Sequence, residues 1–303
     1  KSSAASDVYK RQLEILMEDK PTGLEVCSNI QFYDGISVIR SWTELKNNGE
    51  EDLGVEYVSS FALLGIDKEG LLSTDEKLEV LIARNAWQKE LIWNRFSMDQ
   101  LGMSISQPDK VRRSSQTISV GNTGNWSTKN YLPMGCLKNK ETDSILFWQI
   151  EQNGSWYWEI SDQDGHMYLQ LSGPTEHQSH WWKNLKPGDT FASVPVSVGS
   201  ACGDVEEAAG ELTKYRRAIR RKNEDNEKLP VIFNDYMNCL WGDPTTEKEL
   251  PLIDKAKEAG CEYFCVDCGW YSAGFWWDGV GEWLPSKERF PGGLKAVSYT
   301  HLR

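Results

Sequence analysis

The chain has 303 residues, 39% of them hydrophobic, and a formal net charge of -12 at pH 7. That length suits one large domain or two ordinary ones, and the hydrophobic share is sufficient for a core. The acidic balance argues against a nucleic-acid partner, which would require a basic face, and no apolar stretch reaches membrane-spanning length.

The two ends differ in character from the rest of the chain. Residues 1–12 and 297–303 resemble translated adapter sequence of the kind found in assembled metagenomic data. We therefore interpret both segments as non-native additions and exclude them from the fold prediction.

Residues 13–203 alternate between short apolar segments and polar turns. Predicted strands, rich in β-branched and aromatic residues, cover residues 36–45, 55–63, 79–87, 145–151, 155–160, 167–171 and 191–198. Asn, Asp and Gly cluster between them as predicted turns at residues 47–49, 121–124 and 162–165. Many short strands with little helix predict a large β-sandwich for residues 13–203.

The pattern changes at Asp204, where a charged amphipathic helix is predicted to run to Asn226. Its apolar residues recur at helical spacing and are Val205, Ala208, Leu212, Tyr215 and Ile219. We interpret residues 204–229 as a helical linker between two domains, with the basic run at residues 216–222 facing solvent.

Residues 230–296 predict a strand, a helix and a second strand. Residues 231–233 and 263–266 are apolar runs without alternation, which is typical of parallel strands covered on both faces. Between them, Thr246 and Glu249 have capping-box spacing and Gly260 supplies a stop signal. Leu252, Ile253, Ala256 and Ala259 are predicted to face the sheet.

A carboxylate lies at or just beyond the end of each predicted strand. Asp235 lies two residues beyond the first run and Asp267 directly follows the second. Barrels and doubly wound folds place their chemistry at the carboxyl ends of parallel strands. The chain also has 14 Trp, and five of them lie between Trp241 and Trp283. Indole faces stack on sugars, so this enrichment favours carbohydrate, although Trp upstream of residue 230 serves a β-sandwich core equally well.

The order of motifs over residues 30–297 resembles glycoside hydrolase family 36, the α-galactosidase family of the galactosidase and raffinose synthase superfamily. The matching segments are residues 171–176, 185–189, 230–241, 259–271, 281–283 and 289–294. The resemblance implies an N-terminal β-sandwich, a linker helix and a (β/α)8 TIM barrel. Such a barrel needs about 250 residues, so residues 230–296 would supply its first two strands and the chain is interpreted as a fragment.

The resemblance also implies which residues bind the sugar. In the family the second barrel strand ends in two aspartates that bind galactose hydroxyls, followed by Gly-Trp. Asp267 matches the first aspartate and Trp270 the tryptophan, whereas Cys268 stands in place of the second aspartate. Trp283 matches a sugar-contacting Trp, and Tyr236 occupies a position where many members have Trp.

Further residues are weaker candidates for lining the same pocket. They are Asp235, Trp241, Trp276, Trp277 and Asp278. The structural alternative for Asp267 is a buried ion pair or a helix cap within the barrel.

The activity implied is retaining hydrolysis of α-linked galactosides of oligosaccharides, without a cofactor. The nucleophile and the acid/base of the family belong to later strands, so no catalytic residue is assigned here. A related α-N-acetylgalactosaminidase, a galactosyl transferase of the raffinose-synthase type, and a non-catalytic carbohydrate-binding sandwich remain alternatives. The expected partner is a carbohydrate substrate, and a homo-oligomer of the full-length protein stays open.

Cysteine and histidine patterns add one expectation about the compartment. Seven cysteines without a framework of spacings predict free thiols and favour the cytoplasm. Cys265 and Cys268 form C-x-x-C, but residues three apart on a strand point to opposite faces, so neither a redox nor a metal site is expected. His177 and His180 are interpreted as surface or structural residues.

Overall fold

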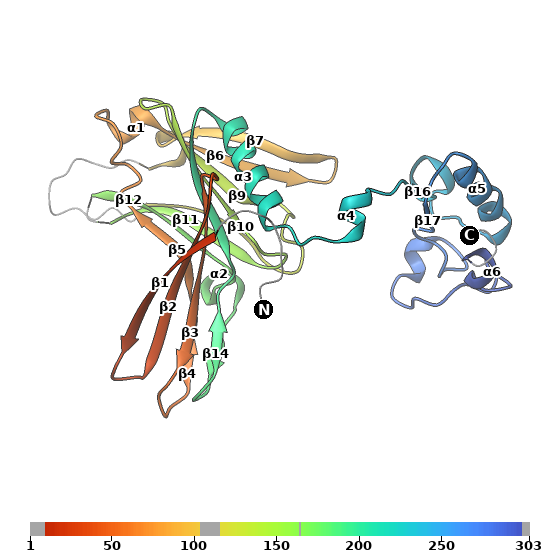
Figure 1. Ribbon diagram of the computed structural model, residues 1–303, viewed down its shortest axis with the longest axis horizontal. Helices are drawn as coiled ribbons and strands as arrows, with labels where there is room; N and C mark the ends of the chain where they lie inside the picture. Colours follow the sequence, from red (N-terminus) through yellow and green to blue (C-terminus); the bar gives the residue numbers. More distant parts are fainter. Residues whose placement is uncertain (1–9, 104–115, 164, 299–303) are drawn as a thin grey trace. The chain divides into compact units, whose positions relative to one another are not determined.

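The computed structural model describes residues 10–103, 116–163 and 165–298 (Figure 1). The chain divides into two compact units, Lys1–Arg220 and Arg221–Arg303. Each unit has a hydrophobic core of its own.

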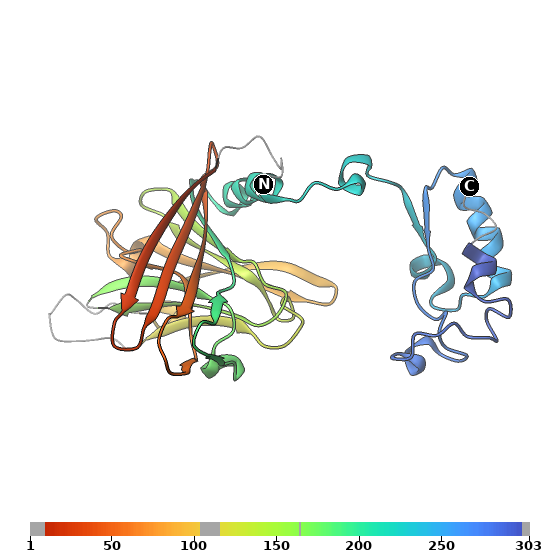
Figure 2. The ribbon, with the colours of Figure 1, turned by 60° about the horizontal axis from the view of Figure 1, so that its bottom comes forward.

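The first unit is built on two antiparallel sheets. The nine-stranded sheet has the order β1-β2-β3-β15-β10-β9-β6-β7, with β14 paired to β3. Figure 2 shows β1, β2 and β3 side by side at one end of this sheet. Its strands are β1 (Lys10–Asp19), β2 (Leu24–Tyr33), β3 (Val38–Asn47), β6 (Leu78–Ala86), β7 (Lys89–Ser97), β9 (Tyr131–Asn139), β10 (Ser144–Ile150), β14 (Thr190–Ala192) and β15 (Val196–Cys202).

The second sheet has four strands in the order β5-β12-β11-β8. They are β5 (Ser59–Leu64), β8 (Thr117–Asn122), β11 (Trp156–Gln163) and β12 (His166–Ser172), and a separate pair joins β4 (Leu53–Val55) to β13 (Lys183–Leu185). Short helical turns connect them: α1 (Thr74–Lys77), η1 (Asp99–Leu101) and α2 (Glu176–Ser179). The predicted β-sandwich is confirmed.

The main core lies between the two sheets. Successive side chains of a strand point to opposite faces, so Trp148 of β10 enters this core while its neighbour Phe147 packs on the other side of the sheet. The rings of Trp148 and Trp158, one from each sheet, meet edge to face with centroids 5.1 Å apart. Trp156 is also fully buried. These upstream tryptophans are therefore core residues.

The segment expected to link the domains is divided in two. Helix α3 (Val205–Ile219) packs on the outer face of the large sheet, where Tyr215 meets Tyr33 with ring centroids 5.2 Å apart. The chain leaves the helix at Arg220 with an extended ψ of 127°, and Asn223 caps a second short helix, α4 (Glu224–Lys228). The amphipathic pattern therefore belongs to the sandwich, because its apolar side has a sheet to cover.

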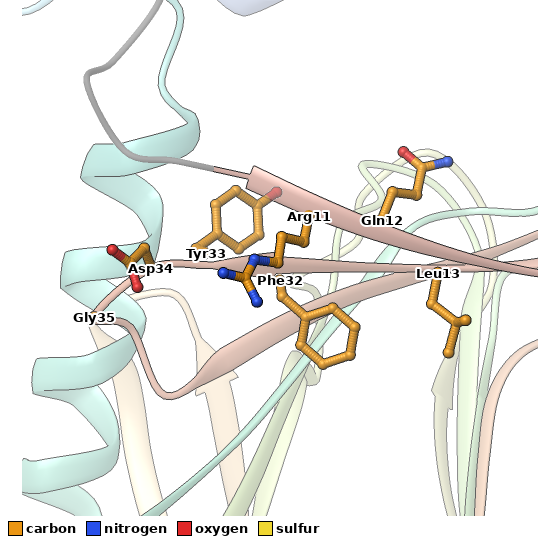
Figure 3. Close-up of a pocket in the computed structure, with 7 residues that line it drawn as sticks. All are labelled: Arg11, Gln12, Leu13, Phe32, Tyr33, Asp34 and Gly35. Carbon is orange, nitrogen blue, oxygen red and sulfur yellow. The ribbon is translucent and has the colours of Figure 1, made fainter.

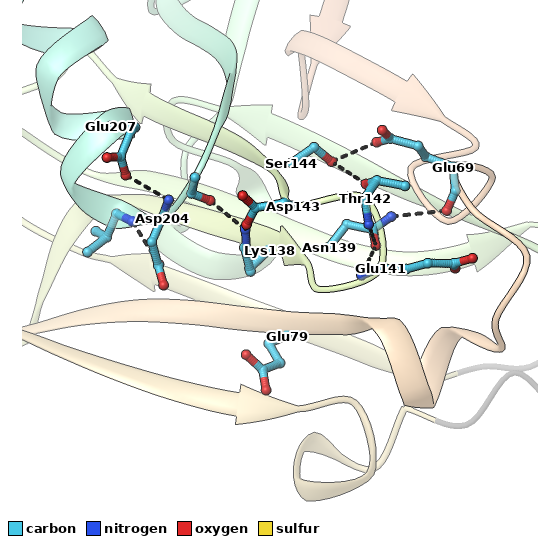
Figure 4. A network of polar contacts seen from close by, with 12 residues as sticks. Glu69, Glu79, Lys138, Asn139, Glu141, Thr142, Asp143, Ser144, Asp204 and Glu207 are labelled. Carbon is cyan, nitrogen blue, oxygen red and sulfur yellow. Dashed lines mark hydrogen bonds and ion pairs between the residues drawn. The ribbon is translucent and has the colours of Figure 1, made fainter.

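Polar contacts hold the start of α3 against the hairpin of β9 and β10 (Figure 4). The Nζ of Lys138, a buried side chain, lies 2.5 Å from Asp143 Oδ1 and 2.5 Å from the Gly203 carbonyl oxygen. Asp204 and Glu207 complete a capping box at the first turn of α3. A buried ammonium with two oxygen partners is satisfied, so this contact stabilises the junction.

Strand boundaries depart from the predictions in several places. Residues 55–63 divide between β4 and β5, and residues 191–198 divide between β14 and β15. Six strands of this unit were not predicted from the sequence: β1, β2, β7, β8, β9 and β13. Residues 10–12 form the start of β1, paired with residues 31–33 of β2, although they were excluded from the fold. Residues 1–9 and 299–303 lie outside the described residues, so the interpretation of both ends stays a prediction.

The second unit contains a parallel β-α-β arrangement. Strands β16 (Ile232–Asn234) and β17 (Tyr263–Cys265) pair in parallel, with α5 (Thr246–Glu258) between them in sequence. The remaining elements are a π-helical turn η2 (Tyr236–Leu240), a 3-10 turn η3 (Trp276–Gly279) and α6 (Leu294–Ser298). The core is formed by Ile253, Phe290 and Val297, with Phe264 and Trp270 packed against it.

Two expectations for this unit are corrected. The strands were predicted to be covered on both faces, but Ile232 and Tyr263 are 59% and 52% exposed, because the described elements pack against one face of the two-stranded sheet. Helix α5 is capped by Thr245, which leaves Glu249 buried in the helix instead of in a capping box, and Ala259 is exposed. No described helix has the length and apolar character to cross a membrane.

Candidate functional site

Two hydrogen bonds donated by backbone amides tie the carboxyl ends of β16 and β17 together. The amide of Asp235 donates to the Cys265 carbonyl oxygen at 3.2 Å. The amide of Asp267 donates to Asp235 Oδ1 at 2.8 Å. The two predicted carboxylate positions are therefore adjacent, but Asp235 is only 1% exposed whereas Asp267 lies at the surface.

The Asp267 carboxylate is oriented by a neighbour that the sequence analysis did not single out. Asn234 Nδ2 donates to Asp267 Oδ2 at 2.8 Å, and Asn234 Oδ1 accepts from the Tyr236 amide at 2.8 Å. An exposed carboxylate held by one side-chain amide keeps further lone pairs for donors such as sugar hydroxyls. The alternative of a buried ion pair does not describe Asp267, which is exposed and forms no ion pair with any described cation.

Cys268 lies beside these two carboxylates. Burial and the negative charges of Asp267 and Asp235 raise the pKa of the Cys268 thiol to about 11. The side chain is therefore a neutral thiol near pH 7, which offers only a weak hydrogen bond where the family has a second aspartate.

The predicted aromatic residues form two groups. In the first, Tyr271 meets Trp283 edge to face at 4.7 Å, and Trp270 lies 6.3 Å from Trp283. In the second, Tyr236 contacts Trp241 at 5.8 Å and Trp276 at 6.0 Å between ring centroids, and Trp276 contacts Trp277 at 4.9 Å. Trp241, Trp277 and Trp283 are all more than half exposed. Asp278 is exposed in η3.

Two glycines allow the loops after β16 and β17 to approach closely. Gly269 has a φ of +92°, and a Cβ there would lie 2.1 Å from the Gly242 carbonyl oxygen. Gly242 has a φ of +79°, and a Cβ there would lie 2.4 Å from the Trp276 ring. Any side chain at either position would separate the loops that carry Trp241 and Trp270.

Arg289 fastens the long loop of residues 270–289, a role that the sequence analysis missed. Its buried guanidinium donates to the carbonyl oxygens of Ser272 at 2.5 Å and Gly274 at 2.7 Å, and it pairs with Asp243. Lys248 and Arg289 both lower the pKa of the Asp243 carboxyl. The only sequence signal was the position of Arg289 within a family motif.

The described residues include no group of three or more His, Cys, Asp or Glu side chains that could hold a metal ion. Both members of the C-x-x-C, Cys265 and Cys268, are free thiols, as are the other five cysteines. His177 and His180 lie exposed at α2.

Two hollows in the described surface bear on the site. One of about 560 Å³ lies at β1 and β2 and is lined by Arg11, Gln12, Leu13, Phe32, Tyr33, Asp34 and Gly35 (Figure 3). It contains none of the predicted site residues. A second hollow, of about 400 Å³, lies in the second unit and is lined by Tyr271 and Glu282 among others.

The chain thus combines a β-sandwich with a parallel β-α-β unit that has a carboxylate and exposed indoles beyond its strand ends. Residues 195–301 match the family Melibiase. The chain is 24% identical over 307 residues to α-galactosidase Mel36A of Lactobacillus acidophilus, covering 97% of this chain and 38% of that protein. It is 28% identical over 147 residues to α-galactosidase 1 of Pediococcus pentosaceus, covering 46% of this chain and 19% of that protein.

Solved structures agree in fold. The α-galactosidase AgaA of Geobacillus stearothermophilus, of family 36, superimposes with a TM-score of 0.77 at 19% identity, over 96% of this chain and 38% of that chain. The galactosidase domain of the α-galactosidase-sucrose kinase AgaSK superimposes with a TM-score of 0.76 at 19% identity, over 95% of this chain and 37% of that chain. The chain is thus similar in sequence and in fold to α-galactosidases of glycoside hydrolase family 36. It spans less than two fifths of the length of these relatives.

Proposed function

We propose that the chain is part of a retaining glycoside hydrolase that acts on α-linked galactosides of oligosaccharides. The observation that carries the proposal is the exposed Asp267 at the end of β17, oriented by Asn234. The relatives support the substrate class: variants of AgaA have been solved with stachyose and with raffinose. The β16-α5-β17 unit argues against a purely sugar-binding sandwich, which would have no use for it.

In this proposal the residues beyond the two strands form part of the floor that binds the glycone. Asp267 accepts hydrogen bonds from sugar hydroxyls, a charged type that contributes about 1.5–3 kcal/mol each. Trp270 and Trp283 present faces on which the sugar ring stacks, and Tyr236 supplies an aromatic edge. Cys268 contributes a small neutral surface.

The reaction itself requires two further carboxylates. In a retaining hydrolase one attacks the anomeric carbon, and the other protonates the leaving oxygen and then activates water. The resemblance places both on later barrel strands, so we assign neither role to Asp235, Asp267 or Asp278. Seven free thiols favour a reducing compartment, and we propose the cytoplasm.

The test is an assay of the complete protein from the same source with a panel of aryl α-glycosides. We expect turnover of the α-galactoside. A complete protein that ignores both α-galactose and α-N-acetylgalactosamine substrates would contradict the proposal.

Cys268 favours a second candidate, in which the glycone is substituted or lacks one hydroxyl. If another residue of the complete barrel replaces the missing acceptor, Cys268→Asp should change efficiency on α-galactosides by less than about tenfold. If the vacancy reflects a different glycone, the wild type should prefer an α-N-acetylgalactosaminide and Cys268→Asp should raise activity on plain α-galactosides. The same panel of substrates separates the two.

A further inference from the structure

Asp235 and Glu249 form a buried pair of carboxyl groups that has no counter-ion among the described residues. Their residues are 1% and 0% exposed. Asp235 Oδ2 and both carboxyl oxygens of Glu249 receive no hydrogen bond from any N–H or O–H donor among the described residues. Two ionised carboxylates in such a place would be very costly, since a buried charge must be paired.

The described groups that interact with the pair supply no positive charge. Asp235 lies near the thiols of Cys239, Cys265 and Cys268, whose pKa values burial and its negative charge raise, and Glu249 lies near Asp235 and Cys239. Lys248, which is next to Glu249 in sequence, and the buried Arg289 are both engaged with Asp243. In the described part of the chain no ion pair reaches either member of the buried pair.

We propose that Glu249 is a protonated acid that shares its proton with Asp235, and that this pair positions Asp267. Glu249 donates to Asp235 Oδ2, and Asp235 Oδ1 accepts from the Asp267 amide at 2.8 Å. The shared proton supplies a hydrogen bond between the two carboxyl groups and leaves the pair with one negative charge in place of two. Glu249 is thus a positioning residue on α5 that acts on the strand end through Asp235.

Electrostatics agrees with this arrangement. Burial, together with the hydrogen bond to Asp235 and its negative charge, raises the pKa of Glu249 to about 8. At neutral pH the pair therefore carries one proton. The relevance of this pair to sugar binding rests on the proposed function. The proposal that the two carboxyl groups share a proton is independent of that function.

The experiment uses the 303-residue chain labelled with ¹³C at the Glu side-chain carboxyl and with ¹⁵N in the backbone, titrated by NMR from pH 4 to 10. We expect the Glu249 carboxyl to titrate with a midpoint near 8 and the Asp267 amide resonance to move with the same midpoint. In Asp235→Asn the Glu249 midpoint should fall by at least about one pH unit, because the neighbouring charge is gone.

Glu249→Gln retains a neutral donor to Asp235, so the Asp267 amide should keep its position and lose the titration near pH 8. Glu247→Gln, which changes an exposed carboxylate in the first turn of the same helix, should alter neither midpoint. A wild-type Glu249 midpoint below about 6, or an Asp267 amide that titrates identically in Glu249→Gln, would overturn the proposal. The readout contains no sugar, so a failure of the proposed hydrolase activity is recognised separately.

Discussion

Asp267 and Glu249 show how far single side chains are determined by their surroundings. Both are acidic residues near a strand end or a helix start, yet one is exposed and the other fully buried. The exposed one is free to meet a ligand, whereas the buried one must keep a proton. Their environments therefore predict different consequences of mutation.

Asp267→Ala in the complete enzyme should lower kcat/KM for an α-galactoside by at least about 100-fold. Loss of a charged hydrogen-bond acceptor that binds the transition state raises the activation free energy by roughly 3 kcal/mol. The Tm should barely fall, because the carboxylate is exposed and its described side-chain contact is with Asn234. Glu247→Ala, at another exposed carboxylate, is the control. A variant that loses stability but keeps its efficiency per folded molecule would instead support a structural role.

Glu249 should make the second unit less stable as pH rises. Its pKa is raised from 4.5 to about 8, so the folded state holds a proton that the unfolded chain releases between these values. The free energy of unfolding should therefore fall across that window, by at most about 1.4 kcal/mol per pH unit, and level off above it. Urea unfolding followed by Trp fluorescence from pH 5 to 9 measures this. Glu249→Gln should flatten the curve, and stability that rises through the window in the wild type would refute the sign.

At the scale of elements, Arg289 holds the aromatic loop to the start of α5. Arg289→Lys should destabilise the second unit by about 2 kcal/mol or more, since one ammonium cannot reach the carbonyl oxygens of Ser272, Gly274 and Pro244 that the guanidinium bonds. Urea unfolding provides the measurement. Lys287→Ala, at an exposed position two residues earlier, should change stability by less than about 0.5 kcal/mol.

Which elements could be predicted depends on the signal that each carries. Strands such as β10 and β12 have apolar residues that face a core, so their composition revealed them. Strand β1 has every residue exposed, and hence its sequence lacks the alternation of a half-buried strand. The spacing of Thr246 and Glu249 predicted a capping box with Thr246 as the N-cap. The N-cap is instead Thr245, one residue earlier, and the Glu249 side chain is buried.

Contacts between distant segments could not be predicted from the chain. Asn234 and Asp267 are 33 residues apart, and Arg289 and Asp243 are 46 apart. Local patterns predicted the strand ends and their acidic residues, but only the fold shows which of them is buried. The candidates Trp270, Trp283 and Tyr236 came from the family resemblance, and composition added only an enrichment in Trp.

At the scale of the whole molecule, the 303-residue chain by itself should show no glycosidase activity. The expectation rests on the family resemblance, which assigns the two catalytic carboxylates to later barrel strands, and on the share of the relatives that the chain spans. Turnover of an aryl α-galactoside is the measurement, with the complete protein as the positive control. Release of aryl alcohol above the buffer background by the purified chain would contradict it.

The bare face of the β16-β17 sheet has a practical consequence for handling the protein. Ile232 and Tyr263 leave apolar surface in water, and a two-stranded parallel sheet offers unpaired edges on both sides. Such a surface promotes self-association, so solubility should be limited by the second unit and should worsen as concentration rises. Ending expression after Arg220, where α3 is complete, would remove that surface.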